Sequence, residues 1–144
     1  MITAIACDHA GFNLKEKVRD YLEKNNIEYI DFGVYDTQSA EYYEYAHKVC
    51  ESINSGESAR GILVCGSGIG MAMAANKHKN IRAACCSDTY SARMTRQHND
   101  ANLLTMGERV VGCGLALDIV RIFLVTEFEG GRHQSRVDAL NKLI

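Results

Sequence analysis

Short apolar runs alternate with longer amphipathic segments along almost the whole chain. Short apolar runs bounded by turn residues are typical of buried strands, and apolar positions three and four residues apart are typical of a helix face. We expect strands at residues 2–7, 27–32, 61–65, 81–86 and 103–111, the last interrupted at Gly107. We expect helices at residues 12–24, 40–55, 71–78, 90–98 and 115–128, and another that begins near 132. This alternation predicts an α/β fold with a parallel, doubly wound sheet.

Length and charge restrict the class of protein. A chain of 144 residues suits one domain with its own core, so we expect a single domain over residues 1–144. The net charge of −2 argues against a nucleic-acid partner. The most apolar stretch, residues 110–125, contains Asp118 and Arg121, and the first residues lack a basic leader, so we expect no membrane partner and a cytoplasmic location.

The six cysteines stand at positions 7, 50, 65, 85, 86 and 113. In a reducing compartment they are expected to be free thiols. No Cys-x-x-Cys pair occurs, and adjacent residues on a strand point to opposite faces, as Cys85 and Cys86 would. We therefore expect no metal site.

Residues 61–70 form the stretch that most favours an active site. An apolar run ends at Cys65, and glycines follow at 66, 68 and 70. A thiol at the carboxyl end of a parallel strand would face exposed N–H groups that can hold an anion. The alternative to an active site is that this glycine-rich turn serves tight packing alone. A dinucleotide fingerprint fits less well, because its third glycine would fall at Met71, although Asp88 stands at about the distance of a ribose-binding acid. A P-loop lacks its Lys-Ser/Thr pair.

Other segments have two interpretations each. Asp8 and His9 follow the first strand and would share the sheet edge with Cys65, or Asp8 would cap a helix. Arg132 and Arg136 lie four residues apart after two glycines, which suits a phosphate or a solvated face. The helix at 115–128 is apolar over most of its circumference. It is either a core helix or a surface covered by a second subunit, and we favour the second subunit.

Five segments together resemble ribose-5-phosphate isomerase type B in order and spacing. They are residues 7–12, 65–70, 96–102, 107–112 and 129–137. The resemblance covers essentially the whole chain. It implies a Rossmann-like α/β subunit that interconverts ribose 5-phosphate and ribulose 5-phosphate without a cofactor. It also implies a homodimer or a dimer of dimers whose active sites are shared between subunits.

The resemblance also implies roles for individual residues. Cys65 would be the base that moves a proton between C2 and C1, and Ser67 would assist transfer between the oxygens. Asp8 and His98 match residues associated with ring opening. The enediolate would be stabilised by the loop amides, at Gly66, Gly68, Ile69 and Gly70 among others. Substrate contacts are implied for His9, Tyr42, Asn99, Arg109, Arg132 and Arg136, and of these Asn99 and Arg109, like His98, would come from the neighbouring subunit.

One departure from the family pattern is visible. Members commonly read Asp-Tyr-Pro where this chain has Glu41-Tyr42-Tyr43. Loss of the proline frees φ and restores an N–H, so the loop with Tyr42 is expected to be less fixed. Isomerases of six-carbon sugar phosphates, such as allose 6-phosphate or galactose 6-phosphate, share the scaffold and are the nearest alternative. A nucleotide-binding or regulatory domain is the alternative outside catalysis.

Overall fold

The sheet has the parallel arrangement that the alternation of segments predicts. The computed structural model describes residues 1–143 and shows five strands there, all paired in parallel in the order β2-β1-β3-β5-β4. The strands are β1 (Thr3–Cys7), β2 (Tyr29–Asp31), β3 (Arg60–Cys65), β4 (Ala83–Cys85) and β5 (Leu103–Gly107). The chain leaves β1 toward β2 on one side and reaches β3 on the other. Ligands of open α/β sheets bind outside the carboxyl ends of strands at such a reversal.

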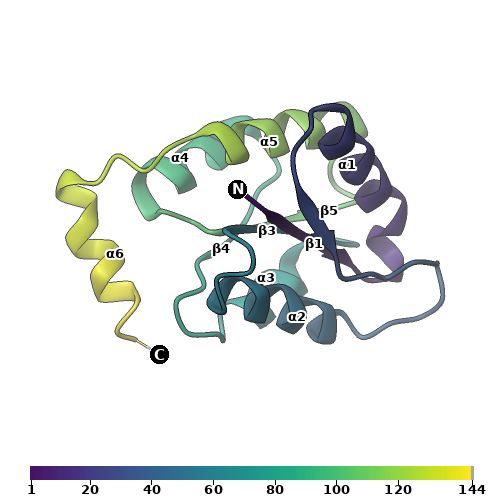
Figure 1. Ribbon diagram of the computed structural model, residues 1–144, viewed down its shortest axis with the longest axis horizontal. Helices are drawn as coiled ribbons and strands as arrows, with labels where there is room; N and C mark the ends of the chain where they lie inside the picture. Colours follow the sequence, from purple (N-terminus) through teal and green to yellow (C-terminus); the bar gives the residue numbers. More distant parts are fainter. Residues whose placement is uncertain (144) are drawn as a thin grey trace.

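Helices cover both faces of the sheet (Figure 1). They are α1 (Phe12–Lys24), α2 (Tyr42–Asn54), α3 (Ile69–Ala75), α4 (Thr89–Asn99), α5 (Cys113–Val125) and α6 (Gln134–Leu140), with 3-10 turns η1 (His9–Gly11) and η2 (Gly131–His133). Helices α1, α4 and α5 lie on one face, and α2 and α3 lie on the other. Helix α6 stands outside both layers at the left of the view. None of the helices within residues 1–143 has the length and apolar character that crossing a membrane requires.

The three central strands form a core on each side of the sheet. Ile5, Val64 and Met106 pack toward α1 and α5, whereas Ala6 and Leu63 pack toward α2 and α3. All residues of β1, β3 and β5 are buried. The edge strands β2 and β4 are shorter than the predicted 27–32 and 81–86, because each finds a ladder partner on one side only.

Helix boundaries follow the prediction where local signals dominate and differ where tertiary contacts act. The prediction for α1 is confirmed at both ends. Helix α3 begins two residues earlier than predicted, because Gly68 at φ +81° provides its N-cap, and it ends at Ala75, three residues before the predicted end. Helix α5 ends at Val125, three residues before the predicted end. Two buried arginines satisfy carbonyls at the end of this helix: Arg60 donates to those of Phe123 and Leu124, and Arg96 donates to that of Thr126.

Most apolar side chains of α5 face the core of their own chain. Ile119, Val120 and Phe123 are buried, whereas Leu115 and Val125 are exposed. The core-helix interpretation therefore accounts for the composition of α5, and its apolarity by itself requires no second subunit.

Candidate active site

A groove of about 430 Å³ lies at the carboxyl ends of β1 and β3. Its lining residues are Asp8, His9, Ala10, Tyr42, Cys65, Gly66, Ser67, Gly70, Arg109 and Val110. They come from the segments that follow three strands of the sheet and from the first turn of α2. The fold thus gathers most of the site residues predicted in segments 7–12 and 65–70 at the point where the strand order reverses.

Cys65 differs from the other buried cysteines in its surroundings. The backbone N–H of Gly68 donates to its Sγ atom at 3.0 Å, and the side chain is 6% exposed. An N–H aimed at sulfur stabilises negative charge there. Burial raises the pKa of Cys7, Cys50 and Cys86 to about 12, so those thiols stay protonated at neutral pH. Within the described residues, Cys65 is the one cysteine that lines the groove.

The glycine loop after Cys65 is held in a conformation that needs Gly68. This residue has φ +81°, and a Cβ there would lie 2.8 Å from the carbonyl carbon of Met106. The Thr105 hydroxyl, fully buried in β5, donates to the Gly68 carbonyl at 2.8 Å. Thr105 thus positions the loop, and no motif in the sequence indicated this role.

The structure leaves fewer N–H groups of the loop free for an anion than the sequence predicted. The N–H of Gly68 is engaged by Cys65 Sγ, and the N–H of Ile69 donates to Ser67 Oγ at 3.3 Å. Ile69 also does not line the groove. Gly66 and Gly70 do line it. A substrate oxygen therefore meets fewer free amides than the five of residues 66–70, because two of them already serve side chains of the loop.

Asp8 and His9 are both fixed by backbone contacts. Asp8 Oδ1 accepts from the N–H groups of Ala10 at 2.9 Å and Gly11 at 3.1 Å, which confirms the capping interpretation for the turn η1. The same carboxylate lines the groove, so the two interpretations of Asp8 are compatible. His9 Nδ1 accepts from the N–H of Ala40 at 3.2 Å. Its hydrogen therefore sits on Nε2 in the neutral ring.

Tyr42 stands at the start of a helix and not within a loop. It is the first residue of α2, and its ring lies against Gly70, where a Cβ would be 3.2 Å from the ring. Tyr43, at the position of the family proline, is in the first helical turn. An N–H in that turn has no acceptor within the helix, so the exchange of proline for tyrosine changes no hydrogen bond inside the helix.

Arg109 belongs to the groove of its own chain, whereas the resemblance assigned it to a neighbouring subunit. Its backbone N–H donates to the Gly66 carbonyl at 3.1 Å, and its guanidinium lies 3.2 Å from the Cβ position of Gly66. The preceding residue, Glu108, accepts from the N–H of Leu14 at 2.8 Å and so ties this segment to the first turn of α1. These contacts place one guanidinium beside the thiol loop.

His98, Asn99, Arg132 and Arg136 lie at the opposite edge of the sheet. Helix α4 precedes β5, so its last residues must lie at the amino ends of the strands, and Asn102 there accepts from the N–H of Gly61 at 2.9 Å. The six residues of β3 separate this edge from Cys65 by roughly 17–20 Å. The segment before α6 is tied to the same edge, because the N–H of Glu129 donates to the Gln97 carbonyl at 3.1 Å.

Near that amino edge the predicted residues have other neighbours. The His98 ring stacks on His133 with centroids 4.4 Å apart and planes at 14°. Asn99 lines a second cavity of about 390 Å³ between α6 and the sheet. Arg132 lies in η2 and Arg136 in α6, and both are exposed.

Comparison with known proteins identifies the family of this chain. The family model described as "Ribose/Galactose Isomerase" matches residues 3–140. The chain belongs to the ribose/galactose isomerase family. It is 46% identical over 140 residues to "Ribose-5-phosphate isomerase B" of Escherichia coli, and the aligned residues cover 97% of this chain and 94% of that protein. It is 40% identical over 138 residues to "D-erythrulose-4-phosphate isomerase" of Pectobacterium atrosepticum, with 95% and 91% covered.

A solved structure gives the same result for the fold. The structure of Clostridium thermocellum Ribose-5-Phosphate Isomerase B matches with a TM-score of 0.98 at 50% identity, over 99% of this chain and 97% of that one. The parallel five-stranded sheet of this chain is thus the fold of a ribose/galactose isomerase. In this family member the predicted site residues fall into two sets at opposite edges of the sheet, one around Cys65 and one around His98.

Proposed function

We propose that this chain interconverts D-ribose 5-phosphate and D-ribulose 5-phosphate through a cis-enediolate, with Cys65 as the general base. The observation that carries the proposal is the position of the thiol. Cys65 Sγ receives the Gly68 N–H and lines a groove with Asp8, Ser67 and Arg109. A base, a hydroxyl and a cation are thereby placed around one space large enough for a small sugar phosphate.

The proposed reaction uses these groups in sequence. The Cys65 thiolate removes the proton from C2, the electron pair forms the C1–C2 double bond, and the C1 carbonyl oxygen becomes the enediolate oxygen. Ser67 relays a proton between the two oxygens. The thiol then returns its proton to C1, so that the C2 oxygen becomes the ketone. The N–H groups of Gly66 and Gly70 and the Arg109 guanidinium stabilise the charge that develops on oxygen. No cofactor is needed for this exchange.

We further propose that a second copy of the chain completes each groove. His98, Asn99, Arg132 and Arg136 lie at the amino edge of the sheet, whereas Asp8 and Cys65 follow its carboxyl edge. Ring opening needs an acid and a base near the furanose oxygen, and the phosphate needs guanidinium groups. In a homodimer or a dimer of dimers, the partner's His98 would join Asp8, and the partner's Arg132 and Arg136 would hold the phosphate.

The direct test is turnover by the purified protein without added metal or cofactor. We expect conversion of ribose 5-phosphate to ribulose 5-phosphate, which an assay of ketose formation detects. Allose 6-phosphate and galactose 6-phosphate are assayed in parallel in the same way, and erythrulose 4-phosphate, which is already a ketose, is assayed by its disappearance. A higher kcat/KM for one of these would keep the isomerase reaction and replace the substrate. If no sugar phosphate reacts while NAD or a nucleotide raises the melting temperature, the isomerase proposal is wrong.

A mixing experiment tests the shared site. Cys65→Ala and His98→Gln remove residues from opposite edges, so we expect each variant alone to be severely impaired. When subunits exchange in an equal mixture, half of the dimers contain one subunit of each variant, and each of these has one intact site out of two. The mixture should therefore regain about a quarter of wild-type activity. A site built within one chain predicts no recovery. Mixing Cys65→Ala with Asp8→Asn, which alter the same edge, is the matched control and should recover nothing.

Substrates of another length are the second candidate for this site. The family description includes galactose, and the Pectobacterium relative is named for a four-carbon sugar phosphate.

The six free thiols fit a reducing compartment, so we place the activity in the cytoplasm.

A further inference from the structure

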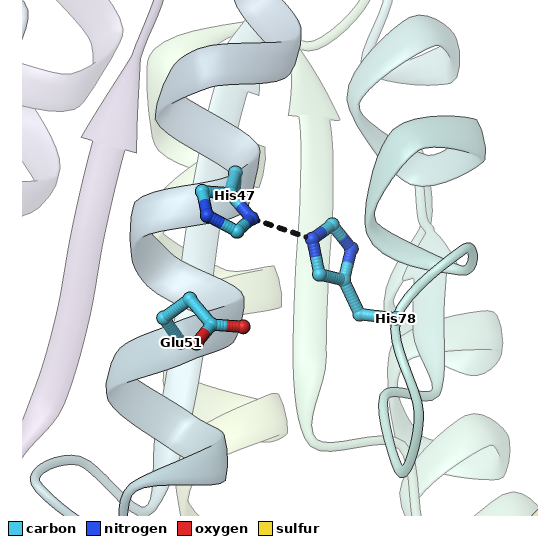
Figure 2. A group of neighbouring side chains, drawn as sticks. All are labelled: His47, Glu51 and His78. Carbon is cyan, nitrogen blue, oxygen red and sulfur yellow. Dashed lines mark hydrogen bonds between the residues drawn. The ribbon is translucent and has the colours of Figure 1, made fainter.

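A second cluster of ligating side chains lies on the α2–α3 side of the sheet, outside the groove (Figure 2). His47 and Glu51 stand four residues apart on α2, and His78 follows the end of α3. One ligand atom from each of the three lies within 4.8 Å of the others. None of the three lines the groove around Cys65. The proposed isomerase function therefore leaves this cluster unexplained.

The orientation of His78 is fixed by the backbone. Its Nδ1 atom lies 3.1 Å from the Ala74 carbonyl oxygen and 3.3 Å from that of Ala75. Because a carbonyl only accepts, Nδ1 carries the hydrogen and Nε2 presents a lone pair. A histidine that donates one ring N–H to a carbonyl and offers the other nitrogen is held as metal-bound histidines are held.

His47 and Glu51 face that lone pair from the neighbouring helix. His47 Nδ1 lies 2.8 Å from His78 Nε2, and Figure 2 shows the Glu51 carboxylate below both rings. Without a metal, the His47 Nδ1 hydrogen bridges the two rings. Two imidazole nitrogens on a tetrahedral Zn²⁺ are roughly 3.3 Å apart, given bonds of about 2.0–2.1 Å. A small rotation of the exposed His47 ring provides that separation, and its hydrogen then moves to Nε2.

We propose that His47, Glu51 and His78 bind a first-row transition-metal ion such as Zn²⁺. Two imidazoles and one carboxylate suit Zn²⁺, whereas Mg²⁺ and Ca²⁺ prefer sites built from oxygen alone. Three protein ligands leave a fourth position for water. The ion would join α2 to the segment after α3. Helix α2 begins at Tyr42, and helix α3 begins directly after the Cys65 loop. The sequence prediction of no metal site rested on cysteine spacing, which cannot detect histidines from separate segments of the chain.

The group formed by His98, Glu129 and His133 is a poorer metal site. The rings of His98 and His133 are nearly parallel and stacked, so their nitrogens do not converge on one point. Burial, followed by the neighbouring His98, lowers the pKa of His133. This second group provides a matched control for the experiment.

Calorimetric titration of chelator-treated protein with ZnCl₂ tests the proposal, with MgCl₂ as the ion that should not bind. We expect one Zn²⁺ per chain at this site and a rise in melting temperature on binding. We expect Zn²⁺ binding to weaken at least about tenfold in each of the variants His47→Gln, Glu51→Gln and His78→Gln. Tenfold is the lower end of the loss that follows removal of a group that only supports a metal ligand. Glu44→Gln removes the same charge from the same helix and should leave the affinity unchanged, as should His133→Gln.

Two results would overturn the proposal. One is no Zn²⁺ binding, or binding that His47→Gln and Glu51→Gln leave unchanged; both residues are exposed, so these variants should fold. The other is a Co²⁺ complex with an intense near-ultraviolet band, which marks thiolate ligation and would move the ion to a cysteine. Weakened binding in both exposed variants, with no such band, supports the site.

Discussion

Cys65→Ala is expected to lower kcat for ribose 5-phosphate isomerisation by about 10²–10⁴-fold, the usual contribution of a general base. The reason is that Cys65 alone among the cysteines of residues 1–143 combines access to the groove with an N–H donor at 3.0 Å. KM should change little, because the thiol acts on the carbon-bound proton and not on the phosphate. Steady-state kinetics of the purified variant provide both values.

Cys113→Ala is the matched control for this prediction. Cys113 is an exposed free thiol at the start of α5, outside the groove. We expect its removal to leave kcat and KM at their wild-type values. Full activity of Cys65→Ala would show that another group is the base and would refute the proposed mechanism.

Gly68→Ala is expected to lower kcat by about 10²–10³-fold, comparable to loss of an oxyanion donor. A Cβ at this position would lie 2.8 Å from the Met106 carbonyl carbon and 3.0 Å from Cys85 Sγ. The backbone there has φ +81°, which costs a residue with a side chain on the order of 1–3 kcal/mol. The loop must shift to relieve these contacts, and the N–H of Gly68 then leaves Cys65 Sγ.

Gly114→Ala separates this effect from a general intolerance of alanine. Gly114 lies in α5 with no atom within 4 Å of its Cβ position. Alanine there should keep wild-type kcat and stabilise the fold by about 0.4–1 kcal/mol. Denaturant unfolding of both variants distinguishes lost stability from lost catalysis. If Gly68→Ala is as active as wild type, the contact between the Gly68 N–H and the Cys65 thiol has no catalytic role.

The bounds of α1 and the position of Cys65 were predictable because each depends on a short segment of chain. Helical spacing of apolar residues defines α1 from Phe12 to Lys24. A buried apolar run defines β3, and in a parallel sheet the residue that ends such a strand lies at the carboxyl edge. The same rule placed Asp8 at the same edge of the sheet as Cys65 without knowledge of the strand order.

Contacts between distant segments were not predictable in this way. Thr105 holds the Gly68 carbonyl, and Arg60 and Arg96 satisfy the end of α5, because strand order brings these residues together. Neither periodicity nor a motif contains that information. The shortened α5 is a consequence: its apolar pattern extends to Phe128, but the carbonyls near Val125 already have side-chain donors.

The sequence by itself thus determined the alternation of strands and helices and the thiol at a carboxyl strand end, because hydrophobic spacing and chain connectivity act over a few residues. Only the tertiary structure decided that Arg109 joins Cys65 within one chain and that the His98 ring stacks on His133. It also decided that His47 and Glu51 meet His78. These pairings depend on how helices and strands pack, and packing is a property of the whole chain.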